Sequence, residues 1–424
     1  MADLAADLEF RGLVHQVSDP GLLTRLDGDR LVVYWGFDPT SDSLHVGNLL
    51  QLCNLRRLQE AGHRLIALAG GATGIIGDPG GKSEERNLLT VAEVQANVDA
   101  IRPQIEPFLD FSGREGAILV NNGDWLGPVS LLEFLRDVGK HFTVNQMVTK
   151  DSVRSRLDRE GSGISYTEFS YMLLQAADYL HLFDAYGCRL QVGGREQWGN
   201  ITAGIDLVRR VRQETVWGLT TPLVLNADGT KFGKTEEGTV WLDARRTSPY
   251  QLYQFFLRAP DEDVGAYLRY FTFLDHRRIL ELDRVTAEHP DRRQGQRTLA
   301  HEVVALVHGD AATKSAEQAA AALFGEEVAG LDEATILDVF DGAPSSTFSR
   351  TRLNGGVSLV DLLHETGLAA SKTRARTTIE QGGAFVNNRR EQDVDRRIES
   401  HDLIDGRYLV LRRGRREYHL VSFG

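Results

Sequence analysis

The sequence predicts an α/β protein with a doubly wound, largely parallel sheet, followed by an α-helical region and a small α+β module. In its first half, short apolar runs alternate with segments of helical periodicity, which is typical of parallel strands joined by helices. From Ser248 to about Phe324 the periodicity is helical, and both kinds of segment return after Val357. A chain of 424 residues is too long for one ordinary core, so we expect two or three domains.

Five segments of the first half are predicted to form buried strands, because they are short, apolar and bounded by turn residues. They are LVVYWGF (31–37), RLIALAG (64–70), AILV (117–120), RLQVGG (189–194) and TPLVL (221–225). The helices predicted between and after them are VGNLLQLCNLRRLQEAG, VAEVQANVDAIRPQIEPFL, VSLLEFLRDVGKHF and EQWGNITAGIDLVRRV. In the last module, SLVDLLHETGLAASKTRARTTIEQGG is predicted to form two helices, and AFVNN and RYLVLRRG short strands.

The composition narrows the class of protein. Hydrophobic residues make up 42% of the chain and charged residues 25%, as in soluble globular proteins. No apolar run approaches the ~20 residues of a membrane span, and the acidic start MADLAADLEFRG lacks the features of a signal peptide. The two cysteines, Cys53 and Cys188, have no metal-like spacing. We therefore expect a cytoplasmic protein with no membrane segment and no metal site of its own.

The charge is distributed unevenly along the chain. Residues 371–424 contain 12 Arg and Lys against 8 Asp and Glu, whereas the first 370 residues contain 36 against 52. A basic tail on an acidic body indicates nucleic-acid contact by the tail, although a solvated basic face gives the same pattern. Lysine is rare, with 7 against 41 arginines, and three of the seven lie in the glycine-containing segments GDPGGKSEER and DGTKFGKT. A flexible lysine is suited to a phosphate that moves during a reaction.

The segment GFDPTSDSLHVGN (36–48) lies where a ligand would bind in such a fold. It leaves a predicted strand and starts a helix, and ligands of open parallel sheets bind beyond the carboxyl ends of strands, at helix N-termini. His45 and Thr40 can donate hydrogen bonds to an anionic oxygen, and Gly47 lets a group approach the backbone. The pattern favours a triphosphate, although a lone histidine here is also typical of a simple helix cap.

A competing interpretation comes from GGATGIIG (70–77), whose glycine spacing occurs in dehydrogenases that bind NADP. Those enzymes use a Tyr-x-x-x-Lys pair, and no lysine of this chain has a tyrosine four residues before it. The glycines also run directly into Asp78 and Pro79, and a proline there would disturb a helix. Both observations count against an oxidoreductase.

HVGN (45–48) and KFGKT (231–235) resemble the two signatures of class I aminoacyl-tRNA synthetases, usually written HIGH and KMSKS. Five stretches, two of which contain these signatures, are similar to bacterial tyrosyl-tRNA synthetases, and the resemblance covers essentially the whole chain. They are YWGFDPTSDSLHVGN, GGATGIIGDPGGKSEER, FSYMLLQAADYL, QVGGREQWGNI and DGTKFGKT, followed by an RNA-binding S4-like tail from about residue 357.

This resemblance implies a fold and a reaction. The expected domains are a Rossmann-like catalytic domain (1–228), the KFGKT loop with an α-helical, anticodon-side domain (229–325), a linker (326–352) and an S4-like domain (353–424). The expected enzyme activates L-tyrosine with ATP, Mg²⁺ accompanying the ATP, and transfers it to tRNA(Tyr), with no permanently bound cofactor. It should be a homodimer, with GDWLGPVSLLEFLRDVGKHFTVNQMV as its interface; an ordinary buried helix would explain that segment as well.

The resemblance also assigns roles to individual residues. Tyrosine binding falls to Tyr34, Asp78, Tyr171, Gln175, Asp178 and Gln197. ATP binding falls to Gly36, Asp38, His45, Gly47, Asn48, Gly194, Glu196, Lys231, Phe232 and Lys234. Catalytic roles fall to Thr40, His45, Lys82, Arg86, Lys231, Lys234 and Thr235, and RNA binding to Lys372, Arg374 and Arg376. No residue is assigned to a metal.

The spacing of one group agrees with these roles. Tyr171, Gln175 and Asp178 lie at i, i+4 and i+7, on one face of a predicted helix. Such a buried polar stripe is costly unless it is paired, either with a ligand or within an internal network. The chain departs from the family pattern at Asn48, which replaces the final histidine of HIGH, and at Glu196, which replaces an aspartate.

Trp35 is a third departure, because it is bulky beside the expected ATP site. Two alternatives remain besides the dehydrogenase. A tryptophanyl-tRNA synthetase shares both signatures, but a Tyr34–Asp178 pair suited to a phenol and the S4-like tail favour tyrosine. A non-catalytic RNA-binding protein on the same scaffold would be expected to have lost His45 or the lysines, and these are present.

Overall fold

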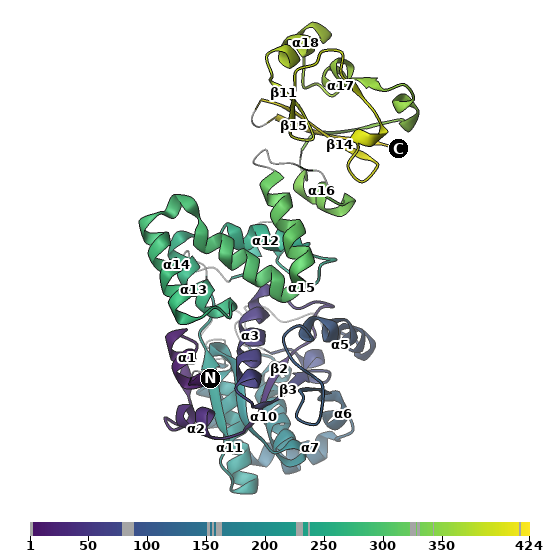
Figure 1. Ribbon diagram of the computed structural model, residues 1–424. Coiled ribbons are helices and arrows are strands. Elements are labelled where there is room, and N and C mark those ends of the chain that lie inside the picture. Colours follow the sequence, from purple (N-terminus) through teal and green to yellow (C-terminus); the bar gives the residue numbers. More distant parts are fainter. Residues whose placement is uncertain are drawn as a thin grey trace. The chain divides into compact units, whose positions relative to one another are not determined.

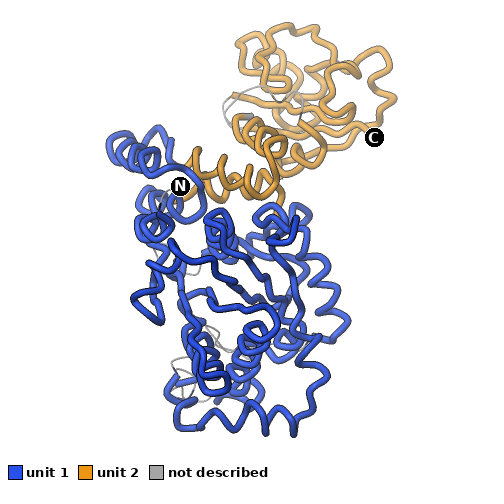
Figure 2. Tube along the Cα trace, turned by 60° about the horizontal axis from the view of Figure 1, so that its bottom comes forward, with its two compact units in different colours: residues 1–246, 260–295 blue, residues 247–259, 296–424 orange. Residues whose placement is uncertain are grey.

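The computed structural model describes residues 3–78, 89–150, 153, 154, 157, 163–225, 232–235, 238–322, 328, 331–341, 343–414 and 417–424. The chain forms two compact units (Figure 2). The first comprises residues 1–246 and 260–295, and the second comprises residues 247–259 and 296–424.

A six-stranded sheet forms the centre of the first unit, in the order β1-β6-β5-β2-β3-β4 (Figure 1). Its strands are β1 (Gln16–Val17), β2 (Val32–Phe37), β3 (Arg64–Ala69), β4 (Ile118–Asn121), β5 (Cys188–Gly194) and β6 (Trp217–Thr221). All pairs are parallel except β1 with β6. The chain runs outward from β2 through β3 to β4, and β5 then returns to the other side of β2. This reversal between β2 and β5 is the switch point at which open α/β sheets bind ligands.

The prediction for the fifth strand is wrong in position. We expected TPLVL (221–225), whereas β6 spans Trp217–Thr221. Pro222 ends the ladder because it has no N–H to donate, so the strand consists of the residues before it. The two-residue strand β1 was not predicted, because its sequence is too short to show a period.

Helices cover the sheet, as the alternating pattern predicted (Figure 1). In the first unit they are α1 (Leu4–Phe10), α2 (Leu22–Gly28), α3 (Val46–Glu60), α4 (Thr73–Ile76), α5 (Val91–Ile105), α6 (Gly123–Leu126), α7 (Leu131–Asp137), α8 (Val144–Val148), α10 (Tyr166–Tyr186), α11 (Trp198–Arg212), α13 (Asp261–Phe271) and α14 (His276–Glu288). Local chemistry sets their ends: Ser165 and Glu168 form a capping box that starts α10, and Gly187 in the left-handed conformation ends it.

The second unit combines helices with a small mixed sheet. Its helices are α12 (Pro249–Leu257), most of α15 (Gln294–Ala322), α16 (Glu333–Val339), α17 (Leu359–Glu365) and α18 (Lys372–Glu380). The sheet has the order β12-β11-β14-β15-β9, and β10 pairs with β13. These strands are β9 (Ser345–Phe348), β10 (Val357–Ser358), β11 (Ala384–Val386), β12 (Arg389–Glu391), β13 (Arg397–Ile398), β14 (Tyr408–Arg413) and β15 (Glu417–Phe423). Apolar residues of α17, α18, β11, β14 and β15 share one buried core.

The predicted fold class is therefore confirmed: a mostly parallel six-stranded sheet, a helical region and a small α+β domain. The stretch 326–352, predicted as a linker, contains α16 and also β9, which pairs in parallel with β15. The exact domain boundaries stay a prediction. Among the described residues, no helix is long and apolar enough to cross a membrane. Cys53 and Cys188 are both buried free thiols.

Candidate active site

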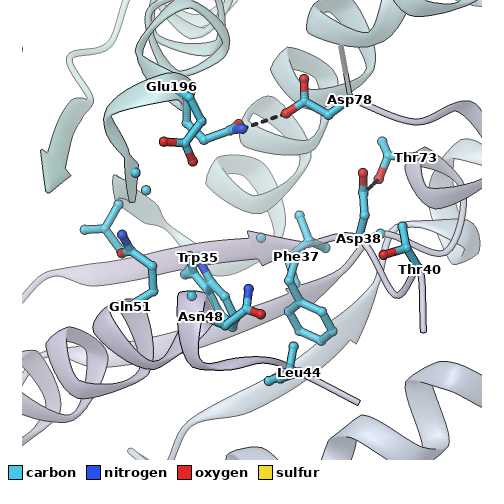
Figure 3. A pocket seen from close by; sticks show the side chains of 18 of the residues that line it. Trp35, Phe37, Asp38, Thr40, Leu44, Asn48, Gln51, Thr73, Asp78 and Glu196 are labelled. Atoms are coloured by element: carbon cyan, nitrogen blue, oxygen red, sulfur yellow. Dashed lines mark hydrogen bonds between the residues drawn. The ribbon is translucent and has the colours of Figure 1, made fainter. Parts of the chain in front are cut away.

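A cavity of about 390 Å³ opens at the carboxyl ends of β2 and β5, where the strand order reverses (Figure 3). The ends of β2, β3 and β5 line it, together with the start of α3 and one face of α10. Fourteen of the residues assigned by resemblance line this one cavity: Tyr34, Gly36, Asp38, Thr40, His45, Gly47, Asn48, Asp78, Tyr171, Gln175, Asp178, Gly194, Glu196 and Gln197.

Tyr34 and Asp178 form one end of the cavity. Tyr34 is fully buried, and its hydroxyl has no hydrogen-bond partner among the described residues. The Asp178 carboxylate accepts hydrogen bonds from Asn122 Nδ2 at 2.9 Å and from Trp125 Nε1 at 2.8 Å. Burial raises the pKa of Asp178 to about 7, although these two donors oppose the rise. A ligand hydroxyl that reaches this end would meet a buried phenol and a carboxylate held in a fixed orientation.

The polar face of α10 is paired, as a buried stripe requires. The Tyr171 hydroxyl lies 3.1 and 3.0 Å from the two carboxylate oxygens of Asp38, at the end of β2. Thr73 Oγ1 donates to the same carboxylate at 3.0 Å, and Asn122 Nδ2 donates to Thr73 Oγ1 at 3.0 Å (Figure 3). Tyr171, assigned to the amino acid, thus contacts Asp38, assigned to ATP.

A second network of hydrogen bonds includes Asp78, Gln197, Gln175 and Asn200. Gln197 Nε2 donates to the Asp78 carboxylate at 2.6 Å (Figure 3), and Gln175 Nε2 donates to Gln197 Oε1 at 3.2 Å. Asn200 Nδ2 donates to Gln175 Oε1 at 3.0 Å and to Gln197 Oε1 at 3.3 Å. The side-chain amides of Gln175, Gln197 and Asn200 therefore fix one another's orientation. The Asp78 carboxylate supplies negative charge at the cavity wall.

His45 is the N-cap of α3, as the cap interpretation predicted, and it also lines the cavity. Its Nδ1 accepts from the backbone N–H of Gly47 at 3.0 Å, and Asn48 Oδ1 accepts from the backbone N–H of His45 at 3.1 Å. Because Nδ1 is an acceptor, the proton of the neutral ring is on Nε2. Asn48 thus closes the capping box with its carbonyl oxygen and keeps its NH₂ group as a donor.

Two glycines allow close packing in and between the two signatures. A Cβ at Gly47 would lie 2.7 Å from the His45 ring, so this position has no room for a side chain. A Cβ at Gly233 would lie 2.3 Å from Val46 Cγ2, and Gly233 has a φ of 82°. The backbone at Gly233 therefore packs directly on the first turn of α3. The N–H of Val46 also donates to Val240 O at 3.0 Å, just beyond that motif.

Comparisons with known proteins agree with this geometry. The family described as tRNA synthetases class I (W and Y) matches residues 26–325, and the tyrosine–tRNA ligase SYY-like C-terminal domain matches residues 335–421. The tyrosine–tRNA ligase of Roseiflexus castenholzii is 55% identical over 423 residues, 99% of each chain. That of Geobacillus stearothermophilus is 49% identical over 99% of this chain and 100% of its own. The chain belongs to the tyrosine–tRNA ligases.

Solved structures place this ligase in the same fold group. A C-terminally truncated mitochondrial tyrosyl-tRNA synthetase of Aspergillus nidulans is 33% identical, with a TM-score of 0.68 over 76% of this chain and 95% of its own. A tryptophanyl-tRNA synthetase of Encephalitozoon cuniculi has a TM-score of 0.53 at 14% identity over 74% of this chain and 89% of its own, which shows the fold alone. The ligase thus activates tyrosine with ATP (EC 6.1.1.1), and the tryptophanyl, dehydrogenase and non-catalytic alternatives are excluded.

The remaining predicted site residues of the ligase divide into three groups. Phe232 is buried and packs against the rings of Tyr267 and Phe271, at 4.9 and 5.3 Å between centroids. The residues Lys82, Arg86 and Lys231 lie outside the described residues, and only the backbone of Lys234 and Thr235 is described, in strand β7 (Lys234–Thr235), which pairs with β8 (Gly238–Thr239). The three tail residues lie exposed on α18: Lys372, Arg374 and Arg376.

Several residues of the site were not predicted from the sequence. They support the assigned side chains or line the cavity: Gln51, Thr73, Asn122, Trp125, Gln191 and Asn200. Asn122 follows directly on β4, so its place at a strand end was a signal that could have indicated it. Gln51 Nε2 donates to Thr221 Oγ1 at 2.6 Å, whereas Gln51 Oε1 and Gln191 Oε1 are buried without a partner among the described residues.

Proposed function

We propose that Tyr34 and Asp178 recognise the phenol of the substrate tyrosine. The observation that carries this proposal is the fully buried Tyr34 hydroxyl, which has no hydrogen-bond partner in the described part of the chain. Buried polar groups are nearly always hydrogen-bonded, so a ligand hydroxyl is the natural partner. Asp178 has its own two donors and keeps acceptor capacity for a third, because an ionised carboxylate offers about four lone-pair sites.

Asp78, Tyr171 and Gln175 bind the α-ammonium group of tyrosine in this proposal. The Asp78 carboxylate supplies the opposite charge, and the other two residues supply oxygen acceptors. Gln197 lies between Asp78 and Gln175, with hydrogen bonds of 2.6 and 3.2 Å to them, and this position supports contact with the substrate carboxylate next to the ammonium group. The amino acid would then be held at both ends.

ATP occupies the part of the cavity between His45 and Glu196. Asp38, Gly36, Gly47, Asn48 and Gly194 line that region, and the first turn of α3 offers the positive end of a helix dipole to phosphate oxygens. His45 Nε2–H and the Thr40 hydroxyl are donors for the same oxygens. Mg²⁺ enters with ATP as part of the substrate, since Mg²⁺ is usually bound by one or two carboxylates together with substrate phosphates.

The first step follows from this arrangement. A carboxylate oxygen of tyrosine attacks the α-phosphorus in line, the bond to the bridging oxygen breaks, and pyrophosphate leaves. The carboxylate is already ionised at pH 7, so this chain needs only to position the groups and stabilise charge. Lys231 and Lys234 act on the departing pyrophosphate, together with Thr235, Lys82 and Arg86. Phe232 anchors the loop that carries the two lysines.

In the second step, the terminal ribose hydroxyl of tRNA(Tyr) attacks the tyrosyl carbonyl, and AMP leaves. The exposed α18 residues Lys372, Arg374 and Arg376 bind RNA phosphates, which fits the basic excess of the tail. The expected compartment is the cytoplasm, in line with two buried free thiols.

We also infer that the ligase is a homodimer. Around α7 and α8, large apolar side chains are exposed, with Leu131 at 69%, Leu132 at 78% and Val144 at 62%. Contiguous exposed apolar surface is typical of a protein–protein interface. A second copy of this chain is the natural partner, because self-complementary patches produce symmetric dimers.

The proposal is tested on Lys234, with Lys314 as the matched control. Lys234→Ala should lower the single-turnover rate of tyrosyl-adenylate formation at least tenfold and leave the dissociation constant of tyrosine within twofold. The reason is that the negative charge that Lys234 would stabilise develops on pyrophosphate during the reaction. Lys314, an exposed lysine of α15, should be replaceable by alanine without effect. An equal loss of tyrosine affinity in Lys234→Ala would contradict the assignment.

A further inference from the structure

The C-terminal end of α13 is held by a buried arginine from the start of the chain. Arg11 follows α1 and is only 4% exposed. Its Nη1 donates to the carbonyl oxygens of Arg269 at 3.2 Å and Thr272 at 3.0 Å, and its Nη2 donates to that of Leu274 at 2.8 Å. The last carbonyl groups of a helix have no partner within the helix and form the negative end of its dipole. A guanidinium therefore suits this position.

A second buried arginine binds the same turn from α3. Arg57, also 4% exposed, donates through Nη2 to the carbonyl oxygen of Thr272 at 2.7 Å, with Tyr270 at 3.3 Å and Arg269 at 3.4 Å. Its guanidinium lies 4.7 Å above the ring of Phe273. Two buried cationic side chains thus converge on a single helix end, and burying a charge is costly unless it is paired and hydrogen-bonded.

Asp7 of α1 holds the two arginines together. Its carboxylate accepts from Arg11 Nε at 2.8 and 2.9 Å and from His276 Nε2 at 2.7 Å, and it lies 3.8 Å from Arg57 Nε. Burial raises the pKa of Asp7, but the His276 hydrogen bond and the arginines outweigh it, so the pKa stays below its ordinary value. Asp7, Arg11 and Arg57 are named the α13 clamp here. In Figure 1, α1 lies close to α13 and α14.

The last part of α13 also contacts Leu225, which precedes the KFGKT motif, and Phe232, which lies within it. On one side, the Tyr267 hydroxyl donates to the carbonyl oxygen of Leu225 at 3.4 Å. On the other side, the rings of Tyr267 and Phe271 pack against Phe232, at 4.9 and 5.3 Å. A displacement of the end of α13 would therefore be passed to Phe232, two residues before Lys234.

We propose that the α13 clamp consists of positioning residues for the lysine loop. Arg11 and Arg57 fix the carbonyl end of α13, α13 fixes Tyr267 and Phe271, and these rings set where the KFGKT motif stands against the first turn of α3. None of the clamp residues lines the substrate cavity, so their effect on the reaction is indirect. This inference rests on the proposed role of Lys234 in adenylate formation.

The test is a double-mutant cycle between Arg11 and Lys234 on the full-length enzyme. Arg11→Met keeps the buried stem and removes the bonds to α13. In the parent background it should lower the single-turnover rate of tyrosyl-adenylate formation about tenfold and leave the dissociation constant of tyrosine within twofold. In the Lys234→Ala background the same change should alter the rate less than threefold, because the loop has then lost the group that Arg11 positions.

Gln59→Ala is the matched control. Gln59 lies on the same helix as Arg57 and exchanges two hydrogen bonds, of 2.7 and 2.8 Å, with the backbone of Asp110, away from α13. Its replacement should change the rate less than twofold. Asp7→Asn, which keeps the side-chain volume, is measured in parallel and decides the question if Arg11→Met does not fold.

Equal losses from the clamp variant in both backgrounds would overturn the inference, because the clamp would then act on the whole fold. A fall in tyrosine affinity equal to the fall in rate would do the same. If Lys234→Ala leaves the rate unchanged, the proposed role of the lysines fails instead, and the two failures are thereby distinguished.

Discussion

Replacing Tyr34 by phenylalanine tests phenol recognition with little disturbance of the fold. Tyr34 is fully buried, and its hydroxyl has no hydrogen-bond partner in the part of the chain that the structure describes. An unpaired buried hydroxyl costs free energy. The ligand-free Tyr34→Phe enzyme should therefore have an unfolding free energy equal to or higher than that of the parent.

The same replacement should weaken recognition of tyrosine, although it leaves the stability of the fold equal or higher. A neutral hydrogen bond contributes a net ~0.5–1.5 kcal/mol, which corresponds to a factor of about 2 to 13. The ratio of kcat/KM for tyrosine to kcat/KM for phenylalanine should fall by this factor. The loss should come from tyrosine alone, because phenylalanine has no hydroxyl to bond. Tyrosyl-tRNA synthetases are themselves the standard example of a site that rejects an analogue lacking the hydroxyl it was built to bind.

ATP–pyrophosphate exchange with each amino acid measures the ratio, and chemical unfolding without ligand measures the stability. Tyr179→Phe is the matched control, since Tyr179 is equally buried but its hydroxyl donates to the carbonyl oxygen of Trp217 at 2.7 Å. That variant should lose about 1 kcal/mol of stability and keep its discrimination. If Tyr34→Phe behaves like Tyr179→Phe in both measurements, the Tyr34 hydroxyl serves the fold and the assignment is wrong.

Three further predictions concern charge, space and the tail. Burial raises the pKa of Asp178 from 3.8 to about 7, so the folded chain binds the proton of the Asp178 carboxyl group more tightly than the unfolded chain does. The resulting stabilisation of the fold is complete below pH 3.8 and is lost as the pH rises through about 7. Unfolding measured at several pH values should show the parent losing up to ~1.4 kcal/mol of unfolding free energy per pH unit in that window relative to Asp178→Asn. Gly47→Ala would put a Cβ 2.7 Å from the His45 ring, so adenylate formation should slow at least tenfold with tyrosine affinity retained, and an unchanged rate would show that the ring can move freely. A chain ending at Ala322, which keeps the catalytic unit and α15 but removes the whole mixed sheet, should form tyrosyl-adenylate at nearly the full rate and charge tRNA poorly; intact charging would show that the tail has another role.

The sequence predicted the fold well where one signal dominated. Buried strands such as Val32–Phe37 and Arg64–Ala69 are continuous apolar runs, and capping residues such as Ser165 mark helix starts. The local sequence was therefore enough to place these elements. The strand expected at TPLVL was displaced because Pro222 cannot join a ladder, while WGLTT, with its polar residues, forms the buried strand. Hydrophobicity alone ranked these two neighbouring segments in the wrong order.

The sequence indicated the site residues that lie in signatures but missed those that support them, for a physical reason. Residues in signatures could be recognised from order and spacing alone, as with His45, Gly47 and the α10 stripe. Supporting residues such as Asn122, Trp125 and Asn200 act through hydrogen bonds across the fold, and no local pattern distinguishes them from other polar residues. The clamp on α13 is the extreme case, because Arg11 and Thr272 are 261 positions apart in sequence.

The cavity itself explains how one set of polar groups serves both stability and function. The ionisable groups most costly to bury are already paired within the protein: Asp178 with Asn122 and Trp125, and Asp38 with Thr73 and Tyr171. The cavity-lining polar atoms that the described residues leave buried and unpaired belong to neutral groups, the Tyr34 hydroxyl and the side-chain oxygens of Gln51 and Gln191. Leaving a neutral group unpaired costs less than leaving a charge, so the ligand-free protein can tolerate it. If a bound substrate forms hydrogen bonds with these groups, as proposed for Tyr34, an analogue that cannot do so leaves them unpaired, and selectivity follows from that free-energy difference.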